Sequence, residues 1–282
     1  MHVVTIDVQE GKKFFSAELA IPESWDEVPL SIYPELCSLY LKRPDEMSDY
    51  DKTVRAFSLI ALEQWDVIKK LSAIEVYQLL PLIDWVFNKL DLVVNHMPDI
   101  EIGGLSYIGP TDEMENLRFA EWCLADTHYI NFAKHSNYAD LHYLAACLYR
   151  PAGEGAEYIP TSSTYRGDQR EKFNDQLLVY RSGIMSTLPK ATLDGIYLFF
   201  ASSKHRITKM YPEFFPPAPK DKPVQANAGD QQFSWFDIYD DLRGDPKFGG
   251  PEKLEDEFLH TVLASIERSK KTMKDLKKRH KI

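Results

Sequence analysis

The segment Phe119–Pro151 constrains the fold of this chain more than any other stretch. Its sequence, FAEWCLADTHYINFAKHSNYADLHYLAACLYRP, places aromatic, acidic and histidine residues in two runs that are each long enough for a helix. Asn137 and Asp140 allow a break between the runs, and Arg150-Pro151 stops the second. The pattern therefore predicts a buried helical hairpin. Its buried faces should carry Phe119, Trp122, Cys123, Leu144, Ala145 and Leu148.

The rest of the chain predicts a mainly α fold with a small N-terminal β-hairpin. Val3–Val8 and Lys13–Ile21 are strand-like and flank the turn candidate Glu10-Gly11-Lys12. A second short strand pair is expected at Leu92–Val94 and Ile100–Ile108. Helical spacing of apolar residues predicts further helices at Thr53–Leu71, Asp168–Ser182, Lys190–Ile207, Ser234–Leu242 and from about Leu254.

Several residues indicate where helices begin or bend. Ser72, followed three residues later by Glu75, matches a capping box for a helix that runs to about Leu90. Pro81 should kink or split that helix. Asp168 is expected to be the N-cap of the helix that follows it.

A segment rich in Pro and Gly divides the chain. Residues 215–230 read FPPAPKDKPVQANAGD, a composition typical of a linker. We therefore expect a helical core domain at residues 1–215, a Pro-rich linker at 216–232 and a C-terminal helical appendage at 233–282. In this interpretation the appendage is a docking element that is separable from the core, although permanent packing on the core is an alternative.

Charge is distributed unevenly along the chain. The net charge is −10, which argues against nucleic acid as a partner of the whole surface. Arg268–Ile282 contains eight Lys or Arg against one Asp, so this end carries about +7 and the remainder about −17. Such a basic end can be a solvated helix terminus, a docking arm for a protein, or a nucleic-acid contact.

The cysteines and the N-terminal residues indicate the cellular compartment of the protein. Cys37, Cys123 and Cys147 show no CxxC spacing and lie in apolar runs, which indicates reduced, buried thiols. The first residues lack the basic and apolar regions of a signal peptide, and no run approaches 18 apolar residues. We expect a cytoplasmic protein that does not insert into a membrane.

Residues 121–142 hold the best candidates for an enzyme site. The group contains donors suited to zinc or iron, namely Glu121, Asp126, His128, His135, Asp140 and His142. The histidines are spaced by seven residues, and the chain contains no HExxH, GxSxG or P-loop motif. We therefore expect no catalytic, metal or cofactor site. The alternative is an α-helical metal-dependent or acid/base enzyme in which at least three of these side chains face one cavity.

The order of several short segments resembles a known group of proteins. The segments are IPESWDEV at Ile21–Val28, FAEWCLAD at Phe119–Asp126, DLHYLAACLYRP at Asp140–Pro151, GDQREKFN at Gly167–Asn174, LPKATLDGIYLFFASSKHRI at Leu188–Ile207 and WFDIYDDLRGDP at Trp235–Pro246. Together they resemble tail-region proteins of Bacteroidetes phages and prophages, some of them described as tail-assembly-chaperone-like. The resemblance implies a structural or assembly role in the bacterial cytoplasm or in the phage particle.

These observations favour a non-enzymatic protein that acts through contacts with other phage structural or assembly proteins. Nucleic acid is expected as a partner only through the basic C-terminus, and the sequence leaves the oligomeric state open. The predicted partner-binding residues are Trp235, Phe236, Lys270, Lys271, Lys274, Lys277, Lys278 and Arg279.

Overall fold

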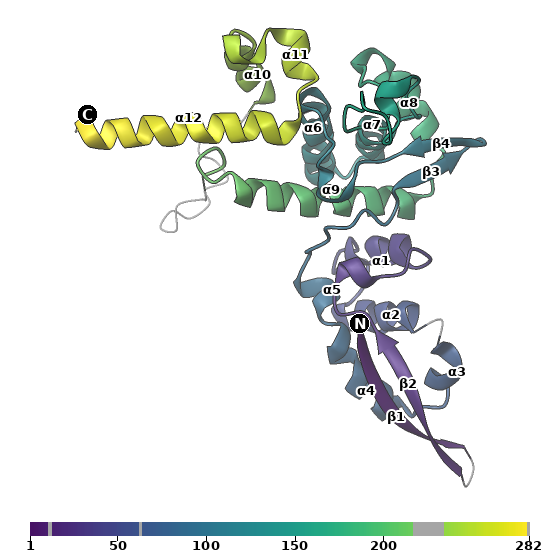
Figure 1. The fold of residues 1–282 in the computed structure, drawn as a ribbon. Coiled ribbons are helices and arrows are strands. Elements are labelled where there is room, and N and C mark those ends of the chain that lie inside the picture. Colours follow the sequence, from purple (N-terminus) through teal and green to yellow (C-terminus); the bar gives the residue numbers. More distant parts are fainter. Residues whose placement is uncertain (11–12, 62–63, 217–233, 281–282) are drawn as a thin grey trace. The chain divides into compact units, whose positions relative to one another are not determined.

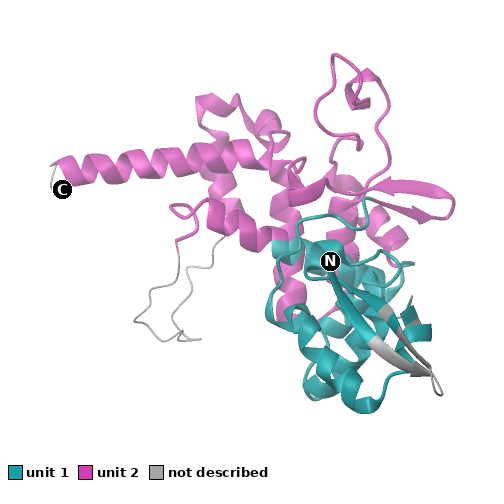
Figure 2. Cartoon of the chain, turned by 60° about the horizontal axis from the view of Figure 1, so that its bottom comes forward, with its two compact units in different colours: residues 1–98, 187–202 teal, residues 99–186, 203–282 magenta. Residues whose placement is uncertain are grey.

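The computed structural model describes residues 1–10, 13–61, 64–216 and 234–280. The chain forms two compact units (Figure 2). Unit 1 consists of Met1–Pro98 and Thr187–Ser202, and unit 2 consists of Asp99–Ser186 and Ser203–Ile282. Most of the described chain is helical, with two short antiparallel strand pairs (Figure 1), so the predicted mainly α fold is confirmed.

Unit 1 combines the N-terminal β-hairpin with short helices. Strands β1 (His2–Glu10) and β2 (Lys13–Ile21) pair in antiparallel register, as predicted. The expected turn residues Gly11 and Lys12 lie outside the described residues. Gln64 holds the end of β2 through two hydrogen bonds to the backbone of Ala20, of 2.7 and 2.8 Å. The helices are α1 (Tyr33–Tyr40), α2 (Asp49–Ile60), α3 (Trp65–Ile68), α4 (Ala73–Leu79), α5 (Trp85–Asn88) and the first part of α9 (Lys190–Met210).

The helix signals of unit 1 act as the sequence predicts. Ser72 and Glu75 form the capping box at the start of α4. At Pro81 the helix is replaced by a 3-10 turn, Leu80–Ile83, before α5 begins. The long helix expected over residues 72–90 is therefore split where proline removes a backbone donor.

The predicted strand at Leu92–Val94 is wrong. The backbone N–H groups of Val93 and Val94 donate to the Asp26 carboxylate at 2.7 and 2.9 Å, so they are not available to a strand partner. In unit 2, β3 (Asp99–Ile102) pairs instead with β4 (Leu105–Ile108). Gly103 and Gly104 form the turn between them with φ of 60° and 78°, values that glycine adopts without strain.

Unit 2 is built around the predicted helical hairpin. Its helices are α6 (Phe119–His135), α7 (Tyr138–Leu148), α8 (Leu178–Met185), the end of α9, α10 (Trp235–Arg243), α11 (Pro251–Glu255) and α12 (Leu259–His280). Ser136 ends α6 in the left-handed conformation, and the Asn137 side chain caps α7 by accepting from the Ala139 N–H. Of the six residues expected in the buried faces, five are buried and Cys123 is only partly buried.

The C-terminal segment packs within unit 2. Leu254, Leu259 and Leu263 are fully buried. The Phe119 N–H donates to the Glu257 carbonyl at 2.9 Å, and the Leu259 N–H donates to the Leu117 carbonyl at 2.9 Å. The two units therefore differ from the expected core at 1–215 and appendage at 233–282, because residues 235–266 complete the core around α6. The linker expected at 216–232 lies outside the described residues except for Pro216.

None of the helices in the described part of the chain is long and apolar enough to cross a membrane.

Replacing Leu148 by alanine should destabilise the protein by about 2–5 kcal/mol, the usual cost of truncating a fully buried leucine. Leu105→Ala is the matched control, because Leu105 is 62% exposed and should cost little. Urea denaturation of both variants measures the difference. An unchanged midpoint for Leu148→Ala would contradict the packing of α7.

Candidate functional site

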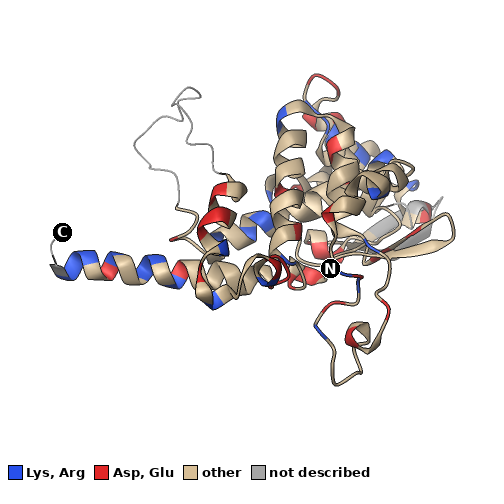
Figure 3. Ribbon diagram, turned by 90° about the horizontal axis from the view of Figure 1, so that it is seen from above, with Lys and Arg blue, Asp and Glu red and all other residues tan. Residues whose placement is uncertain are grey.

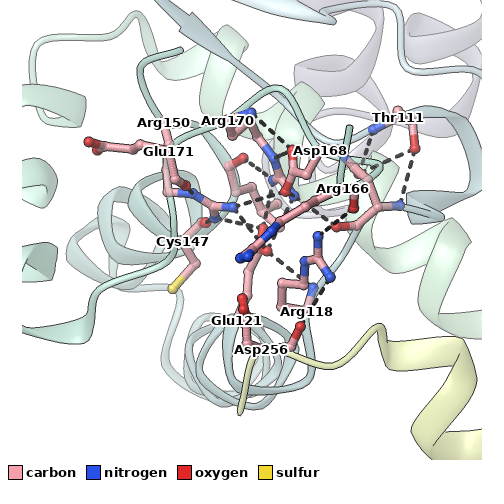
Figure 4. Close-up of polar contacts among 12 residues, drawn as sticks. Thr111, Arg118, Glu121, Cys147, Arg150, Arg166, Asp168, Arg170, Glu171 and Asp256 are labelled. Carbon is pink, nitrogen blue, oxygen red and sulfur yellow. Dashed lines mark hydrogen bonds and ion pairs between the residues drawn. The ribbon is translucent and has the colours of Figure 1, made fainter. Parts of the chain in front are cut away.

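Four charged side chains form a cluster in the core of unit 2 (Figure 4). Glu121 comes from the first turn of α6, Arg150 follows α7, and Asp168 and Arg170 lie in the loop before α8. Each of the four is at most 5% exposed. Two guanidinium groups and two carboxylates balance, so the cluster buries no net charge.

The cluster is held by short ionic hydrogen bonds. The Arg170 guanidinium reaches Glu121 at 2.7 Å and Asp168 at 2.9 Å, and Arg150 reaches Glu121 at 3.0 Å. Backbone carbonyls accept further bonds: Cys147 and Glu171 from Arg150, and Leu148 and Asn116 from Arg170. Every charge in the cluster is paired, which is the condition under which buried ions are tolerated.

Burial and charge act in opposite directions on the two arginines. Burial tends to lower the pKa of both guanidinium groups. For Arg170, Glu121 and Asp168 outweigh burial and raise its pKa. For Arg150, burial and the nearby Arg170 prevail and lower its pKa. Because arginine pKa values lie far above neutrality, both side chains stay charged. The cluster therefore has a structural role, in which it holds α6, the end of α7 and the loop before α8 together.

The interpretation of Asp168 as a helix cap is wrong. Asp168 accepts from Arg170 and from the Asn116 amide at 3.1 Å. The helix after it begins only at Leu178, preceded by a 3-10 turn that Asn174 caps. An aspartate before a helical pattern satisfies the capping rule, but here it accepts from Arg170, two residues later, and from the more distant Asn116 and Arg150.

The six candidate enzyme residues do not share one cavity. Glu121 belongs to the cluster, and Asp126 accepts from Trp235 Nε1 at 2.8 Å and pairs with Lys204. His128 Nδ1 lies 3.3 Å from Asp140 Oδ1, whereas His135 is exposed. Burial lowers the pKa of His142. Among the described residues, no group of three or more His, Cys, Asp or Glu side chains could hold a metal ion.

The three thiols are not activated. Burial raises the pKa of Cys37, Cys123 and Cys147, so they remain protonated at neutral pH. A thiol becomes a strong nucleophile only when its pKa is lowered.

The two aromatic residues predicted to bind a partner have different environments. Trp235 is 6% exposed, and its ring lies edge-on to Phe119 and Trp122 at centroid distances of 6.0 and 6.3 Å. Trp235 is therefore a core residue that anchors α10. Phe236, by contrast, is 75% exposed.

The basic residues predicted to bind a partner all lie on the second half of α12, which we call the basic helix (residues 268–279). Two of them contact the segment that follows α9: Lys274 Nζ lies 2.8 Å from Glu213, and Lys270 Nζ lies 4.8 Å from the ring centroid of Phe214. The side chains of Lys271, Lys277, Lys278 and Arg279 are exposed. Figure 3 shows Lys and Arg along this helix.

The apolar stripe of α12 continues into the basic helix. In the first half it is buried at Leu259, Val262 and Leu263. In the second half Met273 and Leu276 are 60% and 47% exposed. These two side chains are three residues apart and so lie on neighbouring positions of one helix face. The basic helix thus presents an apolar ridge flanked by cations.

A groove of about 300 Å³ lies between α6, α10 and α11. Cys123 and Leu124 of α6 line it together with Phe236 and Tyr239 of α10. Among the described residues that line it, the carboxylates are Asp175, Glu255 and Asp256, and the cation is Lys172, which lies 3.6 Å from Asp256. The Tyr239 hydroxyl donates to Glu255 at 2.6 Å, and this bond raises the pKa of Tyr239 to about 12.

The groove could not be predicted from the sequence, because its walls come from four separate segments of the chain, residues 120–127, 172–175, 235–239 and 255–256. The signal present in the sequence was the mixture of aromatic and acidic residues in WFDIYDD, Trp235–Asp241.

No family model, curated protein or solved structure matches this chain.

Replacing Arg170 by methionine should destabilise the protein by about 3–5 kcal/mol, because Glu121 and Asp168 would remain buried with one cation fewer. Arg166→Met removes the same charge from an exposed position and should cost less than about 0.5 kcal/mol. Equal unfolding midpoints for the two variants would show that the cluster does not stabilise the fold.

Proposed function

We propose that this protein is a non-enzymatic structural or assembly protein that acts through protein–protein contacts. The observation that carries the proposal is the basic helix, which presents Met273 and Leu276 between exposed cations. The resemblance in the sequence supports a phage or prophage setting. The proposed partners are therefore other phage structural or assembly proteins, met in the bacterial cytoplasm or in the particle.

The chemistry of the basic helix favours an acidic protein surface over nucleic acid. Apolar side chains in the middle of a contact gain free energy by burial against other apolar groups, which a phosphate backbone does not offer. The surrounding cations accelerate and orient the encounter with an acidic partner. The basic helix is twelve residues long, or about 18 Å, which is a suitable length for a helix that docks in a groove.

The enzyme alternative has no comparable support. It required at least three of the six candidates at residues 121–142 to face one cavity, whereas Glu121 binds Arg170, Asp126 binds Trp235, and His128 contacts Asp140.

Neutralising Lys271, Lys277 and Lys278 as glutamines should weaken partner binding about tenfold. Each exposed ionic contact contributes roughly 0.5 kcal/mol, and 1.4 kcal/mol corresponds to a factor of ten. The measurement is quantitative recovery of partners with the tagged full-length chain from infected cells, over a salt series.

Lys70→Gln, Lys89→Gln and Lys134→Gln together form the matched control, because they remove the same charge from exposed positions elsewhere. Identical partner recovery with both triple variants, unaffected by salt, would contradict the proposal.

A further inference from the structure

The groove and the basic helix of the same molecule have complementary chemistry. The groove is lined by apolar and aromatic side chains, among them Leu124, Phe236 and Tyr239, and its carboxylates are Asp175, Glu255 and Asp256. The basic helix has the reverse arrangement, an apolar ridge of Met273 and Leu276 flanked by cations. A cavity of about 300 Å³ lies at the lower end of the range for ligand pockets and has room for these two side chains.

The charges of the helices around the groove are opposite in sign to those of the basic helix. Residues 235–256 contain seven Asp or Glu against three Lys or Arg. Asp237, Asp240 and Asp241 are exposed on α10, and Asp240 lies one helical turn after Phe236, which lines the groove. The basic end carries eight Lys or Arg against one Asp. Figure 3 shows acidic residues on α10 and basic residues along α12.

A molecule cannot place its basic helix in its own groove. Asp256 lines the groove and lies three residues before Leu259, where α12 begins. Since α12 is continuous to His280, Met273 lies about 21 Å along the helix axis from Leu259, and Leu276 about 26 Å. Figure 1 shows this half of α12 projecting beyond α10 and α11. The buried side chains Leu259, Val262 and Leu263 hold the direction of the helix.

We propose that the groove between α6, α10 and α11 binds the basic helix of a second copy of this chain. This inference rests on the proposed function, because it names a partner for the basic helix. Met273 and Leu276 enter the groove against Phe236 and Tyr239, and the flanking lysines face the carboxylates of the groove and of α10. The helix and the groove are different surfaces, so the contact is head-to-tail and repeats into a ring or a filament.

Two variants, each lacking one half of the contact, test the proposal. In the helix variant, Met273→Ser with Leu276→Ser removes the apolar ridge. In the groove variant, Phe236→Lys with Asp240→Lys removes an anchor and repels the basic helix. All four residues are at least partly exposed, with Phe236 at 75% and Met273 at 60%. Circular dichroism verifies folding, and Asp175→Lys with Asp240→Lys replaces the groove variant if it does not fold, because Asp175 is an exposed carboxylate of the groove.

Sedimentation velocity over a concentration series gives the expected result. Wild-type protein forms species heavier than the monomer, and these decrease toward molar salt, where charges are screened beyond about 3 Å. Each variant alone associates at least tenfold more weakly. An equimolar mixture of the two variants forms a one-to-one dimer, because it contains one intact helix and one intact groove. Ile74→Ser with Leu105→Ser, which removes exposed apolar side chains elsewhere, leaves association unchanged.

Three results would overturn the inference: a wild-type monomer at all concentrations, association that neither variant weakens, or a mixture that contains no dimer. Its failure is distinguishable from failure of the proposed function. If wild-type protein is monomeric but the lysine variants still lose partners from infected cells, the basic helix binds another protein and only self-association is refuted. If the lysine variants also keep their partners, both proposals fail.

Discussion

The buried ion cluster of unit 2 is the interaction on which the remaining structure of that unit depends. Arg170 pairs with Glu121 of α6 and with Asp168 of the loop before α8. Arg150, at the end of α7, pairs with the same two carboxylates. Removing four charges from water is costly, and apolar residues of similar volume would often be as stable. What the cluster adds is geometry, because planar guanidinium groups bind carboxylates in few orientations. It therefore fixes how a loop without regular secondary structure lies against two helices.

Arg118 connects the buried cluster to the groove and to the start of α12, which are the surfaces proposed for binding. That side chain donates to the Asp256 carbonyl at 3.0 Å and to the Arg166 carbonyl at 2.9 Å, and its guanidinium lies 3.7 Å above the ring of Phe258. Arg118 is also the residue before α6, whose first turn contributes Glu121. The start of α12, the Asp256 edge of the groove and the buried cluster are thus parts of one connected network.

The sequence predicted the local structure correctly where that structure depends on residues close together in the chain. The capping box at Ser72, the split at Pro81 and the break at Asn137 each depend on residues within four positions, and each is found as predicted. The sequence did not predict the environment of a side chain whose contacts include residues far away in the chain. Asp168 has the local pattern of a helix cap but pairs with Arg150, and Trp235 has the pattern of an exposed helix start but donates to Asp126, 109 residues away. The packing of residues 254–266 was left open for the same reason, because an amphipathic stripe does not identify the surface that covers it.

The fold keeps the basic end of the chain apart from the acidic groove of the same molecule. An acidic body with a basic end would neutralise itself if the end were flexible, since opposite charges on one chain are at high effective concentration. Here the basic residues lie on a helix whose first half is locked by Leu259, Val262 and Leu263 in the core. Apart from local contacts such as Lys274 with Glu213, the helix carries its cations away from the acidic groove beside its own start. The groove and the basic helix thus carry opposite charge on separate parts of unit 2, which is the arrangement that the proposed contact between two copies requires.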